Sequence, residues 1–253
     1  MTALNRDIKI DYLSETDSTN SEARRRLTAV SEKGGSCDTP FAIVAHSQTA
    51  GRGRMGRSFY SPDARGIYLS VVCPLSQDAG QVTLTSRCAV AVCRAVSAEF
   101  NICPKIKWVN DIYINDRKCA GILCEAVNDG NTGKLKYVII GVGINVVGGD
   151  WPQDIRDTAG AILDGGKFTE TVFRSLTERF VREILKVIYD PKEEDMDYYR
   201  QNSNVTGRQI TFTENGVRYS GYAESIDDHG FLMVRMADDT VKTLNSGEIT
   251  VRF

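Results

Sequence analysis

Apolar and polar positions follow two different periods along most of the chain. Short apolar runs bounded by glycine, proline or polar clusters are typical of strands in a buried sheet. Such runs occur at 8–12, 41–47, 66–73, 105–114, 118–127 and 134–146. Apolar residues spaced at helical intervals predict helices at 20–30, 78–100 and 169–189. Strands and helices alternate, so we expect them to share one α+β unit.

The pattern changes near residue 203. Beyond it the chain carries short β-type runs such as "RQITFT" and "EITVRF", separated by polar turns that include "TENG" and "DDHG". Short strands joined by such turns are typical of a small antiparallel barrel. We therefore predict two domains, an α+β domain at 1–203 and a small β domain at 204–253.

The first helix is preceded by polar side chains that are suited to its start. Asp17, Ser18 and Thr19 stand directly before "NSEARRRLTAV", and residues of these types commonly cap helix N-termini. The three arginines at 24–26 are expected on the solvent face of this helix.

Composition and charge exclude several classes of protein. The 253 residues are 42% hydrophobic and 25% charged, as in ordinary globular chains, and the net charge of −2 does not indicate nucleic-acid binding. There is no apolar run of about 20 residues and no signal-peptide pattern, so we expect a cytoplasmic protein without a membrane partner. Seven cysteines without C-x-x-C spacing predict reduced thiols, and two histidines make a histidine metal centre or a Ser-His-Asp triad improbable.

The stretch "AGRGRMGRSFY" (50–60) has the spacing of two phosphate-binding turns. It contains G-x-G-x-x-G, as in dinucleotide-binding folds, and nearly a P-loop, with Arg57 in place of lysine. Both motifs require a helix immediately afterwards, whereas Pro62 and Gly66 follow here without helical periodicity. The sequence therefore disfavours both interpretations.

The same stretch nevertheless has the chemistry of an anion-binding loop. Arg52, Arg54 and Arg57 repel one another unless an anion joins them, and the glycines let backbone N–H groups point at a ligand. A basic surface hairpin with no ligand is the alternative. We favour the anion-binding loop.

A second polar constellation lies in "KWVNDIYINDRKCAGILCE" (107–125). Asn110 and Asp111 precede a strand and Lys118 follows it, so a hairpin would bring them to one edge. Small residues at 120–121 allow a ligand to approach the backbone. The alternative interpretation is that Lys118 is an ordinary charged residue on an edge strand. "GVGIN" (141–145) adds two more glycines.

Four motifs in order resemble those of the biotin protein ligases. They are "DSTN" (17–20), "GRGRMGR" (51–57), "KWVND…DRKCAGILCE" (107–125) and "GVGIN" (141–145), and the ending "SGEITVR" also resembles that family. The resemblance implies a mixed seven-stranded sheet similar to that of class II aminoacyl-tRNA synthetases, followed by a small SH3-like barrel. It also implies a ligase that makes biotinyl-5′-AMP from biotin and ATP with Mg²⁺, and transfers biotin to a lysine of a biotin carboxyl carrier protein.

The resemblance also carries site residues onto this chain. Those expected to bind biotin are Ser18, Thr19, Asn20, Gln48, Arg52, Gly53, Arg54, Lys118, Gly121 and Gly143. Those expected to bind ATP are Arg52, Arg54, Arg57, Phe59, Asn110, Asp111, Asn145 and Arg252. Within these sets, Lys118, Arg54 and Arg52 are the implied catalytic residues, and Asp111 is the implied Mg²⁺ ligand.

Three residues depart from the family pattern, and alternatives remain. Val109 stands where proline is common, Met55 where arginine is common, and Phe59 where tryptophan is usual. A lipoate ligase shares the fold but lacks the arginine-glycine loop, and a biotin-binding module would not release AMP. Only 16 residues precede "DSTN", so we expect no DNA-binding domain and no DNA partner. Monomer and homodimer stay open.

Overall fold

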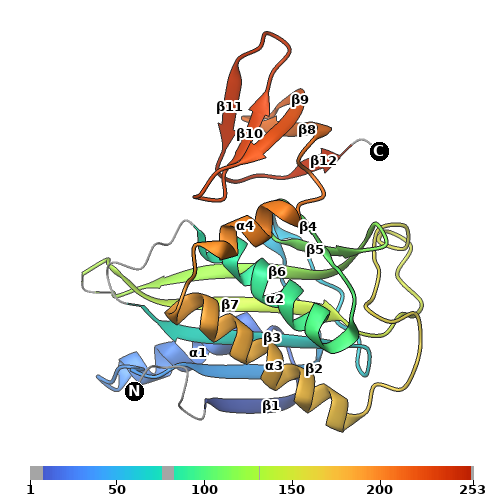
Figure 1. Cartoon of the computed structure of the whole chain (residues 1–253). Helices are drawn as coiled ribbons and strands as arrows, with labels where there is room; N and C mark the ends of the chain where they lie inside the picture. The colour runs from blue at the N-terminus through green and yellow to red at the C-terminus, as the bar shows by residue number, and fades with distance from the viewer. Residues whose placement is uncertain (1–7, 76–82, 131, 252–253) are drawn as a thin grey trace.

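A mixed seven-stranded sheet forms the body of the protein, which is described here by a computed structural model covering residues 8–75, 83–130 and 132–251. In sheet order its strands are β1 (Lys9–Thr16), β2 (Phe41–Gln48), β3 (Gly66–Pro74), β7 (Leu135–Asn145), β6 (Arg117–Asn128), β5 (Asp111–Ile114) and β4 (Lys105–Lys107) (Figure 1). Strands β1 and β2 are parallel and all other neighbours are antiparallel. The predicted mixed sheet is confirmed.

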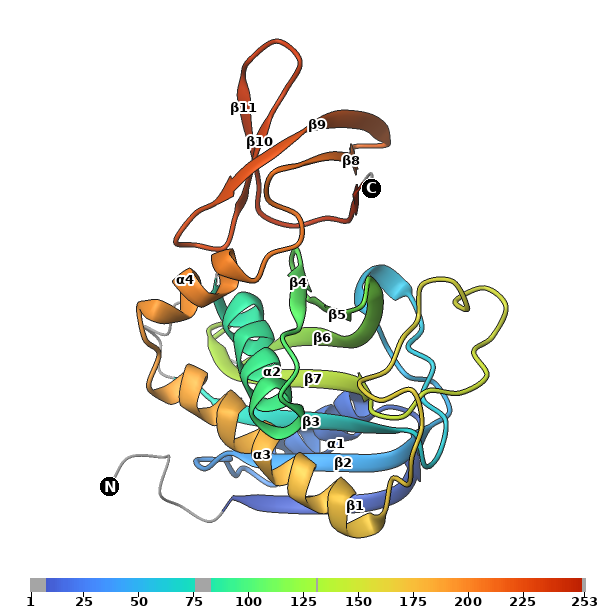
Figure 2. The same cartoon turned by 45° about the vertical axis from the view of Figure 1, so that its right-hand side comes forward.

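Helices cover both faces of this sheet (Figure 2). One face packs against α1 (Thr19–Glu32), whose Ala23 and Leu27 join a buried cluster with Ile43 and Ile139. The other face packs against α2 (Leu84–Phe100) and α3 (Glu170–Tyr189) in the main core. The helix expected at 78–100 is confirmed from Leu84, and 78–82 lie outside the described residues.

One stretch of the α1 face carries mostly glycine and serine, with Leu123 of β6 as its larger side chain. In β7, Val138, Ile140 and Val142 point into the main core, while Gly141 and Gly143 alternate with them on the α1 face. The register places Gly121 of β6 opposite Gly143, and Ser70 of β3 opposite Gly141, on the same face. The sheet therefore leaves an open floor just beyond the N-terminal end of α1.

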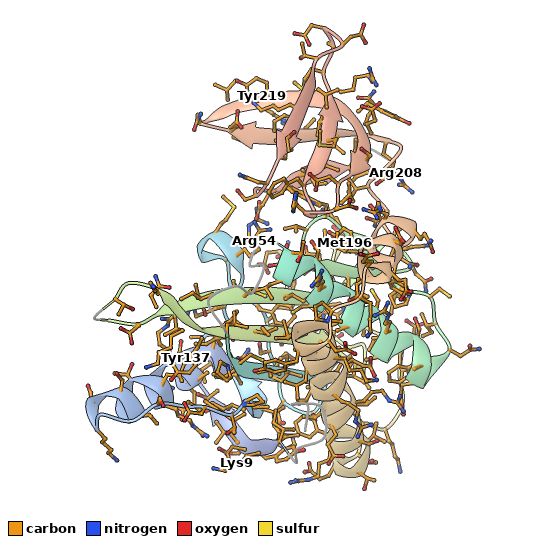
Figure 3. The ribbon with its side chains drawn as sticks, turned by 60° about the vertical axis from the view of Figure 1, so that its left-hand side comes forward. Lys9, Arg54, Tyr137, Met196, Arg208 and Tyr219 are labelled. Atoms are coloured by element: carbon orange, nitrogen blue, oxygen red, sulfur yellow. The ribbon has the colours of Figure 1, made fainter. Side chains whose placement is uncertain are left out.

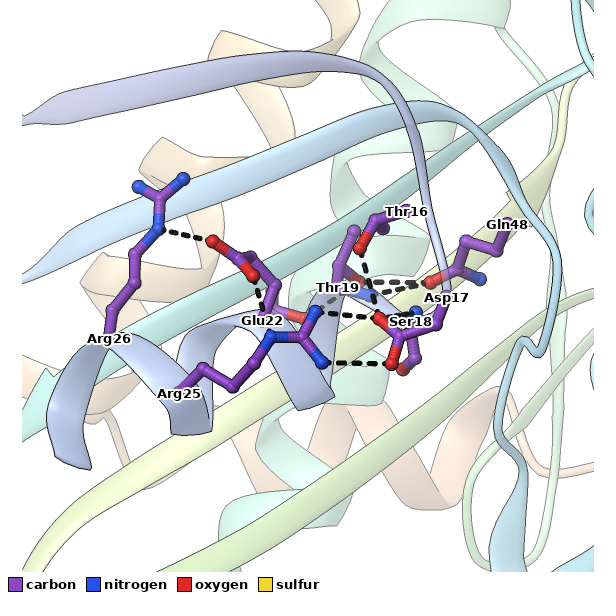
Figure 4. Close-up of polar contacts among 9 residues, drawn as sticks. Thr16, Asp17, Ser18, Thr19, Glu22, Arg25, Arg26 and Gln48 are labelled. Atoms are coloured by element: carbon purple, nitrogen blue, oxygen red, sulfur yellow. Dashed lines mark hydrogen bonds and ion pairs between the residues drawn. The ribbon is translucent and has the colours of Figure 1, made fainter. Parts of the chain in front are cut away.

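The helix start differs from the expectation. Ser18 is the N-cap residue of α1, but its side chain makes no capping hydrogen bond. Asp17 instead accepts the Ser18 N–H at 2.7 Å and pairs with Arg25 through both carboxylate oxygens at 2.7 and 2.9 Å (Figure 4). This pairing holds the pKa of Asp17 well below its usual range. Arg25 remains half exposed, so its place on the solvent face is confirmed.

The strand expected at 105–114 is wrong as a single element. The chain turns at 108–110 and separates β4 from β5, which pair as an antiparallel hairpin. The peptide bond between Trp108 and Val109 in this turn is cis. Helix α4 (Glu194–Gln201) was not predicted, because its eight residues are strongly polar and bury only Asp195, Met196 and Tyr199.

A five-stranded antiparallel domain stands at the β4 end of the sheet (Figure 1). Its strands are β8 (Arg208–Glu214), β9 (Val217–Ile226), β10 (Leu232–Arg235), β11 (Val241–Leu244) and β12 (Ile249–Val251). The chain enters it after residues 202–204 hydrogen-bond along Ile106 of β4. Trp108 Nε1 also donates to the Gly230 carbonyl at 2.8 Å, which fixes the small domain beside the turn at 108–110. The predicted small β domain is confirmed.

No helix in the described ranges is long and apolar enough to cross a membrane. All seven cysteines are free, as expected.

We predict that Phe180→Ala lowers the free energy of unfolding by about 3–5 kcal/mol, because Phe180 on α3 is only 1% exposed and the cavity would persist. Denaturant unfolding measures this. Val172→Ala, on the exposed side of the same helix, should change it by less than about 0.5 kcal/mol. Equal losses in the two variants would show that α3 does not pack on the sheet as described.

Candidate functional site

A pocket, called the narrow pocket below, lies on the open floor of the sheet and measures about 460 Å³ when the space open to solvent at its mouth is counted. All ten residues expected to bind biotin line it: Ser18, Thr19, Asn20, Gln48, Arg52, Gly53, Arg54, Lys118, Gly121 and Gly143. The remaining lining residues are Phe59, Leu69, Asn110, Ile122, Leu123, Gly141 and Val142. Residues from five separate chain segments therefore converge on one small space.

The closed end of the narrow pocket is polar and internally hydrogen-bonded. Gln48 Oε1 accepts from the Thr19 backbone N–H at 2.9 Å and lies 3.2 Å from the Thr19 hydroxyl. Ser70 Oγ lies 2.8 Å from Thr19 Oγ1 and 2.5 Å from Asn20 Oδ1. Thr19, Asn20 and Ser70 are each at most 3% exposed. Buried polar groups with satisfied bonds hold fixed positions, which suits recognition of a compact polar head group.

The arginine-glycine stretch forms a tight hairpin over this pocket. Phe59 N donates to the Gly51 carbonyl at 2.8 Å, and Gly53 N donates to the Arg57 carbonyl at 2.7 Å. A Cβ on Gly51 would lie 2.3 Å from the Phe59 carbonyl oxygen, so only glycine fits at the neck. The tip turns through Met55 at φ 52° and leaves that side chain 73% exposed. No dinucleotide-type helix follows, as expected.

Phe59 lies on the glycine floor. A Cβ on Gly143 would be 2.5 Å from the Phe59 ring, and one on Gly121 would be 3.5 Å from it. The ring meets Tyr68 edge to face, with centroids 6.4 Å apart. Phe59 thus fills the apolar middle of the pocket in this structure.

A β-bulge directs Lys118 toward the pocket. The pairing of β5 with β6 shifts between Ile112 and Tyr113, so Cys119 and Ala120 are both buried and the following Gly121 shares a face with Lys118. A simple alternating strand, as expected from the sequence, would have put Lys118 and Gly121 on opposite faces.

The bulge also brings Lys118 beside Asp111. Lys118 Nζ lies 2.7 Å from Asp111 Oδ1, with side chains 33% and 22% exposed. The two predicted site residues therefore form an ion pair at the mouth of the narrow pocket.

A second, larger depression of about 1130 Å³, open to solvent and called the wide hollow below, adjoins the narrow pocket. The two share Gly53, Arg54, Phe59, Asn110 and Lys118. The other residues that line the wide hollow are Arg57, Ser58, Lys107, Trp108, Asp111, Tyr113, Ile155, Thr158, Gly247, Glu248, Ile249 and Thr250. It thus lies between the sheet and the small β domain, where Figure 3 shows Arg54.

Four cationic side chains line the wide hollow against two carboxylates. Arg54 Nη1 donates to Asn110 Oδ1 at 3.1 Å, and Asn110 Nδ2 donates to the Ile122 carbonyl at 2.9 Å, so the guanidinium is held through the sheet backbone. Burial lowers the pKa of Lys107, whose ammonium lies 5.5 Å from the centre of the Tyr113 ring. Burial likewise raises the pKa of Tyr113 to about 12. A partly desolvated cationic surface of this kind favours a phosphate-bearing ligand.

The hairpin also contacts the small β domain. Arg57 Nη2 forms an ion pair with Glu248 Oε2 across the wide hollow. This contact links the arginine loop to the segment just before β12.

One predicted ATP-binding residue lies outside both cavities, and a second is not among the described residues. Asn145 is 7% exposed, donates from Nδ2 to the Gly160 carbonyl at 2.9 Å, and lines neither cavity. Arg252 lies outside the described residues. Their nucleotide contacts stay predictions.

Several lining residues were missed from the sequence. Gly141 is part of the quoted "GVGIN", and Lys107 opens the quoted "KWVND" run, so the motifs contained both. Ile155 and Thr158 lie in a segment without a recognisable pattern, and only the fold brings them to the wide hollow.

Comparison with known proteins agrees with this arrangement. Residues 16–145, just over half of the chain, match the biotin/lipoate A/B protein ligase family. The chain belongs to that family. Residues 205–252 also match the biotin protein ligase C-terminal domain, which fits the small β domain seen here.

Individual members of the family are similar to this chain over most of its length. A bifunctional ligase/repressor BirA of Bacillus spizizenii is 33% identical over 82% of this chain and 65% of its own length. The chain therefore spans about two thirds of that relative. A biotin–[acetyl-CoA-carboxylase] ligase of Mycobacterium tuberculosis is 27% identical over 95% of this chain and 88% of its own. The biotin protein ligase of Aquifex aeolicus, solved with biotin and ATP, shares the fold with a TM-score of 0.75 at 24% identity, covering 96% of this chain and 98% of its own.

We predict that Glu248→Gln speeds trypsin cleavage after the hairpin arginines about two- to fivefold, because the Arg57 pair no longer restrains the loop. The free energy of unfolding should change by less than about 1 kcal/mol, since the pair is exposed. Timed digestion with mass spectrometry gives the rate. Glu224→Gln, which removes an exposed pair with Arg235 inside the small domain, is the control and should leave hairpin cleavage unchanged. Equal rates in wild type and Glu248→Gln would mean that the pair does not hold the hairpin.

Proposed function

We propose that this chain is an ATP-dependent biotin protein ligase, which activates biotin as biotinyl-5′-AMP and transfers biotin to a lysine of a biotin carboxyl carrier protein. The observation that carries the proposal is the junction of the two cavities at Arg54 and Lys118. A narrow pocket with a polar closed end suits a small acid whose carboxylate points outward. A wide cationic hollow suits a nucleotide, and the two substrates would meet at the junction.

Family membership and the second domain support biotin as the acid. The family includes lipoate ligases as well, but residues 205–252 match a domain described for biotin protein ligases. The polar closed end formed by Thr19, Asn20 and Gln48 offers both donors and acceptors. A ureido ring, with two N–H groups and a carbonyl, needs this mixture, whereas the dithiolane ring of lipoate does not.

The proposed adenylation needs charge stabilisation and orientation rather than proton transfer. A carboxylic acid is ionised at pH 7, so its attack on the α-phosphate requires no general base. The cost is the approach of two anions, which Arg54 and Lys118 at the junction offset. Fixing both substrates in line can contribute up to about 7–11 kcal/mol. The reaction expels pyrophosphate and leaves a mixed anhydride.

The arginine hairpin would protect that anhydride. The mixed anhydride is labile in water, and residues 51–59 lie over the narrow pocket with Phe59 inside it. A closed hairpin excludes water until the carrier lysine arrives. The lysine amine then attacks the acyl carbon and AMP leaves.

Mg²⁺ fits the residues of the wide hollow as a companion of ATP. Within the described ranges no three His, Cys, Asp or Glu side chains gather as a metal site, and Asp111 is one carboxylate on the hollow wall. Mg²⁺ commonly binds through one or two carboxylates with phosphate oxygens and water. When bound it would neutralise phosphate charge, and Asp111 is the residue that would hold it.

The first test is biotin-dependent exchange of labelled pyrophosphate into ATP, with lipoate and octanoate as parallel acids. We expect exchange with biotin alone. Exchange with lipoate but not biotin would assign the chain to the lipoate branch of the family, and silence with all three acids would contradict the ligase proposal.

A second test addresses Lys118. We expect Lys118→Met to slow biotin-dependent exchange roughly 10- to 100-fold, because one charge-assisted contact to the reacting anions is lost. Lys136→Met, which removes a lysine paired with Asp129 at 3.5 Å outside both cavities, is the control and should leave exchange intact. Full activity in Lys118→Met would refute the role given to this lysine.

A further inference from the structure

Glu125, near the end of β6, is the last residue of the motif at 107–125 and lies beside the closed end of the site, but it is not among the residues expected to bind biotin or ATP. Its side chain is only 16% exposed, and it projects from the same sheet face as the narrow pocket. Glu125 Oε2 accepts from Asn20 Nδ2 at 2.7 Å, and Oε1 accepts from Arg52 Nη2 at 2.8 Å. One carboxylate therefore joins α1 to the arginine hairpin.

The carboxylate determines which way the Asn20 amide points. An ionised carboxylate only accepts hydrogen bonds, so it selects the NH₂ group of Asn20 and turns Oδ1 toward Ser70 Oγ, 2.5 Å away. Flipping the amide would place Oδ1 against two acceptors, Glu125 and the Leu123 carbonyl. The Asn20 side chain also cannot move closer to the sheet, because it already occupies the space that a Cβ on Gly141 would need.

The same carboxylate fixes the start of the hairpin. Arg52 is bonded through two of its nitrogens to Glu125, at 2.8 and 3.4 Å, and bridges Ser58 on the opposite arm of the hairpin. Arg52 lines the narrow pocket but not the wide hollow. Glu125 therefore holds the Arg52 guanidinium at the narrow pocket.

We propose that Glu125 is a positioning residue for the acid substrate. It acts through Asn20 and Arg52, presenting a fixed acceptor at the polar end of the narrow pocket and holding the hairpin neck above it. The inference rests on the proposed function, because the acid that reads this end of the pocket is taken to be biotin. Glu125 lines neither cavity, and Asn20 and Arg52, through which it acts, line the narrow pocket but not the wide hollow, so its loss should act on the binding of biotin far more than on that of ATP.

Glu125→Gln keeps the shape of the side chain but lets it donate as well as accept, so the Asn20 amide loses its single orientation. We expect the KM for biotin in pyrophosphate exchange to rise about 10- to 100-fold, and that for ATP by less than about twofold. Calorimetric binding of biotin without ATP should weaken by the same factor. The matched control is Glu99→Gln on α2, which removes a carboxylate paired with Arg179 of α3 at 2.8 Å on the sheet face opposite the pocket and should change neither constant.

A conservative variant guards against misfolding. Glu125→Asp remains an acceptor but is one methylene shorter, so it should bind biotin better than Glu125→Gln and worse than wild type. Wild-type biotin affinity in either folded variant, or an equal rise in the KM values for biotin and ATP, would overturn the inference. If the wild-type protein binds biotin but gives no pyrophosphate exchange, the ligase proposal is refuted. Calorimetry of the variants then still decides whether Glu125 supports biotin binding. Wild type that does not bind biotin would refute both.

Discussion

The candidate site depends on a patch of one sheet face where glycines stand in place of larger side chains. A larger residue at Gly141 or Gly143 would collide with Asn20 or Phe59, and one at Gly121 would crowd the end of Lys118. The opposite face of the same strands carries Ile140 and Val142 into a core closed by α2 and α3. The strands can therefore remain tightly packed on one side and leave a cavity on the other, which a helix start and a hairpin then enclose.

Two local features convert this cavity into a site with direction. The bulge at Cys119–Ala120 carries Lys118 to the mouth, beside Asp111, while the polar network from Gln48 to Asn20 occupies the closed end. The polar residues and the cationic Lys118 therefore lie at different ends of the cavity. The small β domain, fixed by the Trp108 hydrogen bond, adds the far wall of the wide hollow.

The sequence predicted the parts of the site whose chemistry is local. The glycines, the arginines and Lys118 stand in short motifs, and all ten residues expected to bind biotin line one pocket. What could not be predicted depends on register and packing. The alternating pattern hides the bulge, the Ser18 side chain makes no capping hydrogen bond, and the partners of Glu125, which are Asn20, Arg24 and Arg52, come from segments far from it in sequence. The sequence pattern also did not indicate that the Asn145 side chain would donate a hydrogen bond to the Gly160 carbonyl.

In the proposed function, the acid lies with its polar ring at the closed end of the narrow pocket and its carboxylate at the junction of the two cavities. A crystal structure with a nonhydrolysable biotinyl-adenylate analogue tests this most directly. We expect the ureido ring beside Thr19 and Asn20, the phosphate between Arg54 and Lys118, and the Phe59 ring displaced from the apolar chain or packed along it. The reverse orientation, or an analogue bound outside the glycine floor, would contradict it.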